Sequence, residues 1–184
     1  GNPAPAGEVW VRSSSISPGY YHNEEKDKET FTEDGWLLTG DVGTVDAGSM
    51  RLTLIDRKKN IFKLQQGEYI APDRLEHVYK LSDPIIQEIF VYGDGLHSCL
   101  VAIVVVEASA ATGADIKKRV LKVLDDTAKA KGLNSMEKIK NVYIESRPFA
   151  DSDLVTASFK LRRHEASKFY RDIIQRLYSE LEKQ

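Results

Sequence analysis

Two apolar stretches, Ile85–Tyr92 (Ile-Ile-Gln-Glu-Ile-Phe-Val-Tyr) and Cys99–Val106 (Cys-Leu-Val-Ala-Ile-Val-Val-Val), decide the fold of this chain. Both are rich in β-branched residues and have the length of a strand. Gly93-Asp94-Gly95 lies between them, and a turn explains this segment more simply than a phosphate-binding loop does. The region therefore predicts two strands joined by a turn.

Helical patterns and a further strand surround these two strands. Pro72 is suited to a first helical turn, and the helix that it begins is expected to end near Ser82-Asp83-Pro84. Apolar residues recur at helical spacing over Ile116–Ala128, Gly132 is placed to end that helix, and Asn141–Glu145 predicts a strand. One continuous last helix is predicted from the clearest apolar stripe, which we expect to face the core: Ala166, Phe169, Tyr170, Ile173, Ile174, Leu177 and Leu181.

The first third of the chain is predicted to contain strands and turns. Glu8–Ser13 alternates apolar and polar residues, and the strand-like stretches Val42–Val45 and Arg51–Ile55 flank a hairpin connection. His22–Lys28 is polar and charged. After the basic stretch Arg57–Asn60 the pattern changes to mixed helix and strand. We therefore expect an α+β chain with a domain boundary there, between residues 1–58 and residues 59–184.

Composition excludes several classes of function. With 26 Lys and Arg against 28 Asp and Glu, the net charge is −2, which gives no reason to expect a nucleic-acid partner. Cys99 is the only cysteine and the four histidines are scattered, so neither a disulfide within the chain nor a metal site is predicted. The longest apolar run, Leu100–Val106, is far shorter than the roughly 20 residues that span a bilayer. The chain begins Gly1-Asn2 without methionine, which indicates an artificial junction or an internal cut, and no targeting signal is visible.

General motifs identify no site, but an ordered set of segments does. There is no Walker loop, no dinucleotide fingerprint and no nucleophile motif. Gly35–Asp41 (Gly-Trp-Leu-Leu-Thr-Gly-Asp), however, resembles the nucleotide-binding motif of the adenylate-forming superfamily of acyl-CoA synthetases, luciferases and peptide-synthetase adenylation domains. Asp56–Lys63 with Gly67–Pro72 resembles its hinge motif, and Thr156–Arg163 resembles its catalytic-lysine segment. Gly7–Tyr20 is similar to the stretch that precedes these motifs.

The amino-acid sequences of two segments indicate which subfamily the chain resembles. Leu64–Ile70 and the sequence Phe-Lys-Leu-Arg-Arg at Phe159–Arg163 are similar to long-chain fatty acyl-CoA synthetases. Luciferases and coumarate ligases more often have glycine before the catalytic lysine, and this chain has Phe159. The resemblance thus implies part of a fatty acid:CoA ligase that uses ATP, Mg²⁺ and CoA, with metal ligands in none of these motifs.

The resemblance also implies that the chain contains parts of two domains with different roles. Residues 1–58 correspond to the end of the large nucleotide- and acid-binding domain, and residues 59–184 to a small mobile C-terminal domain. The phosphate loop and fatty-acid tunnel belong to a missing N-terminal domain, so we expect the 184-residue chain to be inactive by itself. An intracellular location is expected, in the cytoplasm or at the cytoplasmic face of a membrane such as the endoplasmic reticulum. Membrane association of the parent enzyme stays open.

The nucleotide-binding candidates lie in the first two motifs. Thr39, Gly40 and Asp41 fall in the nucleotide-binding segment. One carboxylate can accept hydrogen bonds from both ribose hydroxyls, and glycine permits a close backbone approach. A simple Gly-Asp turn is the alternative. Arg57 is implied to contact phosphate or ribose oxygens, although a solvated residue in a basic hairpin is its alternative and the preferred interpretation of Lys58.

The hinge and thioester-step candidates follow directly. Lys59 occupies the family's hinge position, whose torsions change as the small domain turns between the half-reactions. Lys63, Gly67 and Glu68 lie in the segment that approaches CoA for the second step. A surface strand lysine and an ordinary turn glycine explain Lys63 and Gly67 about equally well.

Lys160 is the candidate catalytic residue. A flexible ammonium can reach both the attacking carboxylate and the α-phosphate and neutralise charge between them. By itself a lysine in this basic segment would indicate a solvated surface, and the family pattern reverses that interpretation for Lys160 alone. Arg162, Arg163 and Lys168 are expected to be solvated surface residues.

Two other functions remain open. The parent could be an adenylate-forming ligase for aryl or shorter acids, which a panel of acids would distinguish. It could also be a non-catalytic module for nucleotide sensing or protein contacts. Asp41, Arg57 and Lys160 are all present, which argues against the module because a degenerate copy should have lost at least one of them.

Overall fold

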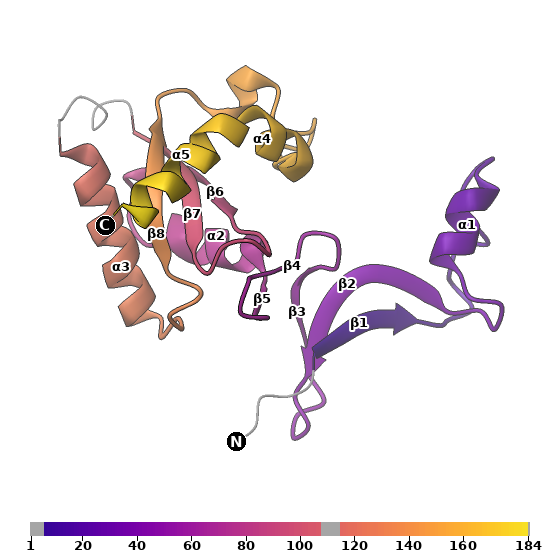
Figure 1. The fold of residues 1–184 in the computed structure, drawn as a ribbon. Helices are drawn as coiled ribbons and strands as arrows, with labels where there is room; N and C mark the ends of the chain where they lie inside the picture. Colours follow the sequence, from indigo (N-terminus) through magenta and orange to yellow (C-terminus); the bar gives the residue numbers. More distant parts are fainter. Residues whose placement is uncertain (1–5, 108–114, 184) are drawn as a thin grey trace. The chain divides into compact units, whose positions relative to one another are not determined.

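The computed structural model describes residues 6–107 and 115–183 (Figure 1). The chain forms two compact units, Gly1–Ile61 and Phe62–Gln184, called here the N-terminal and C-terminal units. Each unit is described by itself. The division lies three residues after the boundary predicted from the basic stretch Arg57–Asn60.

A three-stranded sheet forms the centre of the C-terminal unit. Its strands are β6 (Ile86–Tyr92), β7 (Leu100–Val106) and β8 (Ile139–Glu145), in the order β6-β7-β8. β6 and β7 pair antiparallel across the predicted turn, whereas β7 and β8 pair parallel. The two strands and the connecting turn predicted from the apolar stretches are confirmed.

Side chains of β7 alternate between two hydrophobic cores. Leu100, Ala102 and Val104 pack in one core with residues of α2 (Pro72–Lys80) and α3 (Ile116–Ala130). Val101 and Ile103 pack in the other with residues of α4 (Arg163–Phe169) and α5 (Arg171–Glu182). Successive side chains of a strand point to opposite faces, so one strand contributes to both layers. Figure 1 shows α5 in front of the sheet and α2 behind it.

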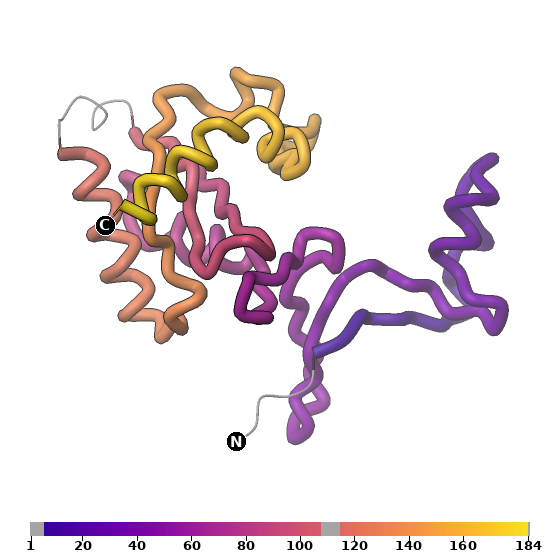
Figure 2. The backbone as a smooth tube through the Cα atoms, viewed as in Figure 1, coloured from indigo at the N-terminus to yellow at the C-terminus, as the bar shows by residue number. Residues whose placement is uncertain are grey.

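The helices of the C-terminal unit follow the sequence patterns, with two corrections. α2 begins at Pro72 and α3 is followed by Gly132 at φ +65°, as predicted. The predicted single last helix is instead α4 and α5, divided at Tyr170, and Figure 2 shows the backbone changing direction between them. The buried Tyr170 hydroxyl donates to Glu145 Oε2 at 3.1 Å, which fixes this residue against β8. Phe169 is 53% exposed, so its predicted place in the core is wrong.

A short hairpin precedes α2. β4 (Phe62–Lys63) and β5 (Tyr69–Ile70) pair antiparallel. Leu64 N donates to Glu68 O at 2.8 Å and Gly67 N donates to Leu64 O at 2.9 Å, which closes the loop. Gly67 has φ +92°, a conformation that L-residues adopt only with strain. The backbone itself therefore requires glycine here.

The N-terminal unit is an antiparallel sheet with one helix. β1 (Ala6–Val11), β2 (Leu37–Val45) and β3 (Leu52–Arg57) form a sheet in the order β1-β2-β3. The polar stretch at His22–Lys28, where no helix or strand was predicted, contributes to α1 (Glu24–Thr30). Asn23 Oδ1 accepts from Lys26 N at 3.0 Å and caps the helix, whose first turn is acidic. Asn23 at the cap position was thus a feature of the sequence from which the start of α1 could have been predicted.

The N-terminal unit has little core of its own. Among its described residues, only Thr30, Gly43 and Asp56 are buried, and none of them is a large hydrophobic residue. Trp10 is 50% exposed and Leu54 is 59% exposed. Burial of apolar surface is the main favourable contribution to folding. These apolar strand residues are therefore exposed and contribute little to the stability of the unit.

An ion cluster joins α4 to α2 in the C-terminal unit, with the side chains of Arg163 and Glu76 largely buried and that of Asp73 half-exposed. Arg163 Nε donates to Asp73 Oδ1 at 2.9 Å and Arg163 Nη1 donates to Glu76 Oε1 at 3.0 Å. Arg163 Nη2 contacts a carboxylate oxygen of each partner as well. Glu76 Oε1 also accepts from Val91 N of β6 at 2.7 Å. The sequence interpretation of Arg163 as a solvated surface residue is wrong, since its side chain is only 16% exposed.

Replacing Glu76 by glutamine should change how stability depends on pH. Burial raises the pKa of Glu76 to about 7, from an unfolded value of 4.5, against the opposing effect of Arg163. Between these values the folded chain holds a proton that the unfolded chain has released. Its free energy of unfolding should therefore fall as pH rises, by up to about 1.4 kcal/mol per unit relative to Glu76→Gln. Urea unfolding followed by far-UV circular dichroism measures this difference. The exposed Glu165→Gln is the control, and equal slopes for wild type and Glu76→Gln would contradict the assignment.

Replacing Gly67 by alanine should destabilise the C-terminal unit. An L-residue at φ +92° costs about 1–2 kcal/mol in free energy of unfolding. Gly95→Ala is the matched control, because Gly95 has no positive φ and an added Cβ would meet only Lys63 O, at 3.7 Å. Urea midpoints compare the two variants. Equal midpoints would show that the loop does not depend on this conformation.

Candidate functional site

Lys160 lies on a tight hairpin immediately before α4. Val155 and Leu161 form an isolated antiparallel bridge. Thr156 N donates to Lys160 O at 2.8 Å, and Lys160 N donates to Thr156 Oγ1 at 3.2 Å. Backbone hydrogen bonds on both sides of Lys160 thus fix the position of its main chain.

The residue before Lys160 is strained. Phe159 has φ +57°, the left-handed region that bulky residues avoid, and its N donates to Thr156 O at 2.9 Å. Its ring is 82% exposed. Strained conformations of this kind persist where the surrounding structure imposes them and are concentrated at functional sites. The hairpin therefore presents Phe159 and Lys160 together to the exterior.

The Lys160 side chain is free for a ligand. Lys160 is exposed, and its ammonium makes no hydrogen bond or ion pair with any residue that the structure describes. The neighbouring basic residues differ. Arg162 pairs with Asp153, at 3.5 Å between Nη1 and Oδ2, and Lys168 pairs with Glu165, at 3.7 Å between Nζ and Oε1. An unpaired ammonium can neutralise charge on a bound anion without first breaking an internal contact.

Asp41 and Arg57 meet in the N-terminal unit. They are cross-strand partners of β2 and β3, and Arg57 Nε lies 3.0 Å from Asp41 Oδ1. The carboxylate is 30% exposed and the guanidinium side chain 57% exposed, so both remain accessible. Asp41 lies within a strand, which excludes the simple Gly-Asp turn considered from the sequence. A carboxylate beside a guanidinium can serve a ribose diol and a phosphate together.

The residues before Asp41 shape the strand at this point. Thr39 Oγ1 donates to Val9 O at 2.7 Å and accepts from Asp41 N at 3.1 Å, so its hydroxyl is used within the sheet. Gly40 has φ +72° and its carbonyl accepts from Lys58 N at 2.8 Å. Thr39 and Gly40 thus position Asp41 through the backbone.

A turn follows Arg57 and contains Lys59. Ile61 N and Asn60 N donate to Arg57 O at 3.2 and 2.9 Å. Asp56, which is 9% exposed, accepts from Arg57 N at 2.6 Å and from Asn60 Nδ2 at 3.3 Å. Sequence reasoning assigned no role to Asp56, although this buried carboxylate organises the turn. Lys59 itself is exposed.

Lys58 differs in one respect from its sequence interpretation. It is solvated as expected, at 66% exposed, but its Nζ also lies 2.9 Å from Glu8 Oε2. This hydrogen bond lowers the pKa of Glu8 below its usual value. Lys58 is therefore occupied within the N-terminal unit.

The loop of the β4–β5 hairpin contains the other candidates. Lys63 is exposed, with Nζ 5.5 Å from the centre of the Tyr69 ring, and Glu68 is exposed at the end of the loop. Gln65 N donates to His97 O at 3.1 Å, and Gln66 Nε2 donates to Ser98 O at 3.2 Å. The loop that contains Gly67 therefore rests on the β6–β7 connection.

The predicted residues form three groups. Thr39, Gly40, Asp41 and Arg57 lie together on β2 and β3, while Lys59 lies in the turn that follows. Lys63, Gly67 and Glu68 share one hairpin, and Lys160 lies on another. Sequence reasoning missed the contacts of Arg163 with Asp73 and Glu76. Arg163 lies in the segment that resembles the catalytic-lysine motif, and Glu76 follows the hinge motif, three residues after Asp73 on one helix face.

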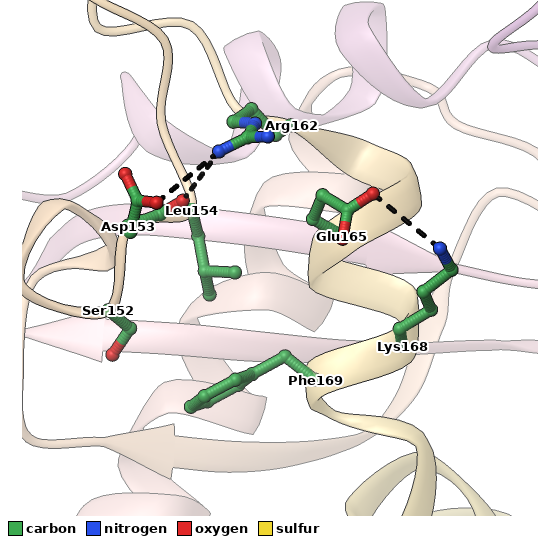
Figure 3. Close-up of a pocket in the computed structure, with 7 residues that line it drawn as sticks. All are labelled: Ser152, Asp153, Leu154, Arg162, Glu165, Lys168 and Phe169. Atoms are coloured by element: carbon green, nitrogen blue, oxygen red, sulfur yellow. Dashed lines mark hydrogen bonds and ion pairs between the residues drawn. The ribbon is translucent and has the colours of Figure 1, made fainter.

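An open groove lies beside the Lys160 hairpin (Figure 3). Its volume is about 450 Å³, and none of the predicted site residues lines it. Figure 3 shows its charged side chains turned toward one another, Arg162 toward Asp153 and Lys168 toward Glu165. Phe169 and Leu154 supply apolar surface. The groove therefore offers no unpaired charge to a nucleotide.

Neither a metal cluster nor a membrane span is found in the described part of the chain. Residues 6–107 and 115–183 contain no group of three or more His, Cys, Asp or Glu side chains that could hold a metal ion. No helix among them is long and apolar enough to cross a bilayer.

Curated proteins similar to this chain include fatty acyl-CoA synthetases and long-chain-fatty-acid–CoA ligases. Fatty acyl-CoA synthetase A of Dictyostelium discoideum is 39% identical over 97% of this chain and 30% of its own length. Long-chain-fatty-acid–CoA ligase 5 of Rattus norvegicus is 37% identical over 96% of this chain and 28% of its own length. The chain thus spans under a third of the length of these relatives.

Solved structures extend the comparison to the fold. The adenylation domain of the carboxylic acid reductase of Segniliparus rugosus, in complex with AMP and a carboxylic acid, is 34% identical with a TM-score of 0.88. The match covers 98% of this chain and 29% of that chain. The corresponding domain from Mycobacterium chelonae is 36% identical with a TM-score of 0.89, over 97% of this chain and 28% of that chain.

The family profile described as "AMP-binding enzyme C-terminal domain" matches residues 59–182. Together with the α+β fold, this match confirms the predicted resemblance. The chain therefore belongs to the family of AMP-binding enzyme C-terminal domains, within the adenylate-forming enzymes.

Proposed function

We propose that this chain is the C-terminal part of a long-chain fatty acid:CoA ligase that uses ATP, and that Lys160 is its catalytic residue for adenylation. The observation that carries the proposal is the unpaired Lys160 ammonium, presented on a strained hairpin. It lies in a chain 37–39% identical to enzymes named fatty acyl-CoA synthetase or ligase.

The proposed reaction has two steps. A fatty acid carboxylate oxygen attacks the α-phosphorus of ATP, the bond to the β-phosphate oxygen breaks, and acyl-AMP and pyrophosphate form. The sulfur of CoA, having lost its proton, then attacks the acyl carbon and AMP leaves with the electron pair of the carbon–oxygen bond. Charge develops on oxygens in both steps, so fixed cationic groups supply much of the catalysis. Lys160 would neutralise the charge between carboxylate and α-phosphate in the first step.

Asp41 and Arg57 are the proposed nucleotide contacts. The carboxylate would accept from the ribose hydroxyls while Arg57, 3.0 Å away, donates to ribose or phosphate oxygens. Thr39 and Gly40 would act by fixing the backbone of Asp41. Mg²⁺ would enter as the ATP complex, because the described residues offer no cation cluster.

The two units fit two proposed domains. Residues 1–58 would end the large domain, and residues 59–184 would form the small domain. The N-terminal unit buries no large hydrophobic residue among those described, which supports packing against a missing N-terminal part of the same enzyme. Lys59 would be the hinge, since its turn lies at the end of the N-terminal unit, two residues before the last residue of that unit, Ile61.

The β4–β5 loop is the proposed contact for the thioester step. Gly67, at φ +92°, permits a close backbone approach to the CoA arm, and exposed Lys63 and Glu68 flank it. Because the enzyme consumes ATP and CoA, we propose an intracellular location, in the cytoplasm or at the cytoplasmic face of a membrane such as the endoplasmic reticulum.

Replacing Lys160 by alanine in the complete enzyme should abolish most activity. With ATP, Mg²⁺, CoA and palmitate, the wild type is expected to release AMP only when the acid is present. Loss of one preorganised cationic group should lower that rate by roughly 10²–10³-fold. A coupled assay of AMP measures the change.

The matched control is Lys168→Ala, which removes an exposed lysine paired with Glu165 and should leave the rate unchanged. Equal rates for wild type and Lys160→Ala would contradict the role of Lys160. Activity only with aryl or short acids would favour the other ligase class. AMP binding without reaction of any acid would favour a non-catalytic module.

A further inference from the structure

We propose that Arg163 is a positioning residue for Lys160, acting through its contacts with Asp73 and Glu76. This inference rests on the proposed function, in which Lys160 serves adenylation. Arg163 touches no substrate in this account. It fixes the base of the hairpin from which Lys160 projects.

Arg163 and its two partners come from helices that pack on opposite faces of the sheet. It is the first residue of α4, whose core residue Ala166 packs on one face of the sheet, as does Tyr170 directly after the helix. Its partners Asp73 and Glu76 belong to α2, which packs on the opposite face. The guanidinium therefore reaches around β6, the end strand in the order β6-β7-β8.

Contacts with β6 complete this arrangement. The Arg163 guanidinium carbon lies 5.9 Å from the centre of the Phe90 ring. Glu76 Oε1 accepts from Val91 N of the same strand at 2.7 Å. One side chain thus joins two helices and a strand in a fixed geometry, which a planar guanidinium with several donors is suited to do.

A short backbone path leads from Arg163 to Lys160. Arg162 N donates to Leu154 O at 2.8 Å, and Leu161 forms the bridge to Val155. Leu154 is buried, so this side of the hairpin is attached to the core. Lys160 follows directly, with Thr156 Oγ1 accepting from its N.

The side chain of Lys160 has no anchor of its own. Among the described residues nothing hydrogen-bonds to its ammonium, so only its backbone determines where it points. A shift of about 1 Å in a catalytic group can lower a rate by roughly 10²-fold. A buried ion pair is often no more stabilising than hydrophobic residues in its place. We therefore assign this cluster, in which the Asp73 side chain is 49% exposed, a role in fixing geometry.

The adjacent arginine is a matched control. Arg162 has the same chemistry and is one residue nearer to Lys160, but among the described residues its side chain pairs only with Asp153, at 3.3 Å to its carbonyl oxygen and 3.5 Å to its carboxylate. Asp153 is 95% exposed. Removing Arg162 therefore takes away a similar charge without releasing α4 from α2.

The test separates the half-reactions in the complete enzyme. Adenylation is measured as palmitate-dependent exchange of pyrophosphate into ATP, and thioester formation is measured from synthetic palmitoyl-AMP and CoA. Arg163→Met should lower exchange by roughly 10–100-fold and leave the thioester rate within about twofold. Arg162→Ala should change neither rate. In a Lys160→Ala background, Arg163→Met should cause no further loss of exchange, because both changes remove one function.

A second variant distinguishes loss of positioning from misfolding. Arg163→Met removes the guanidinium that faces Asp73 and Glu76, so Arg163→Met is repeated with Asp73→Asn and Glu76→Gln, and far-UV circular dichroism checks the fold. Selective loss of exchange in this triple variant supports the proposal. Unchanged exchange, equal loss in both half-reactions, or an additive loss in the Lys160→Ala background would overturn it. If Lys160→Ala itself leaves exchange unchanged, the proposed function fails instead.

Discussion

The burial of β7 is the constraint on which the C-terminal unit depends. Every residue of Leu100–Val106 is buried, and alternate side chains enter two separate cores. A strand covered on both faces must be apolar throughout, and it requires helices on each side. α2 and α3 supply one cover, and α4 and α5 supply the other. The loops of this unit that are proposed to act in catalysis lead into these helices, so this central strand helps to determine their positions.

Arg163 joins the helices on the two faces of the sheet through contacts outside the hydrophobic cores. Hydrophobic packing holds each helix to its own face, but it does not fix how α4 begins relative to α2. The hydrogen bonds of Arg163 with Asp73 and Glu76 do so across the end strand β6. The β4–β5 hairpin leads into α2, and the Lys160 hairpin leads into α4. The segments proposed for the two half-reactions thus each lie one element away from the same ion cluster.

Sequence patterns predicted the features that depend on residues close together in the chain. The apolar run of β7, the proline that begins α2 and the motifs around Asp41 and Lys160 all carry their signal within a few residues. Other features depend on distant partners. The division of the last helix follows from the bond of Tyr170 to Glu145, and the burial of Arg163 follows from α2, about 90 residues earlier. The positive φ of Phe159 arises from hairpin closure and has no signal in its side chain.

Chemical footprinting of Lys160 in the complete enzyme tests the central claim most directly. Lysines are acetylated with and without a non-hydrolysable palmitoyl-adenylate analogue, and mass spectrometry reports the extent at each site. If Lys160 lies at the acyl-adenylate, the analogue should lower its reactivity severalfold, while Lys168, paired with Glu165, stays unchanged. Unaltered labelling of Lys160 at saturating analogue would contradict its place in the active site.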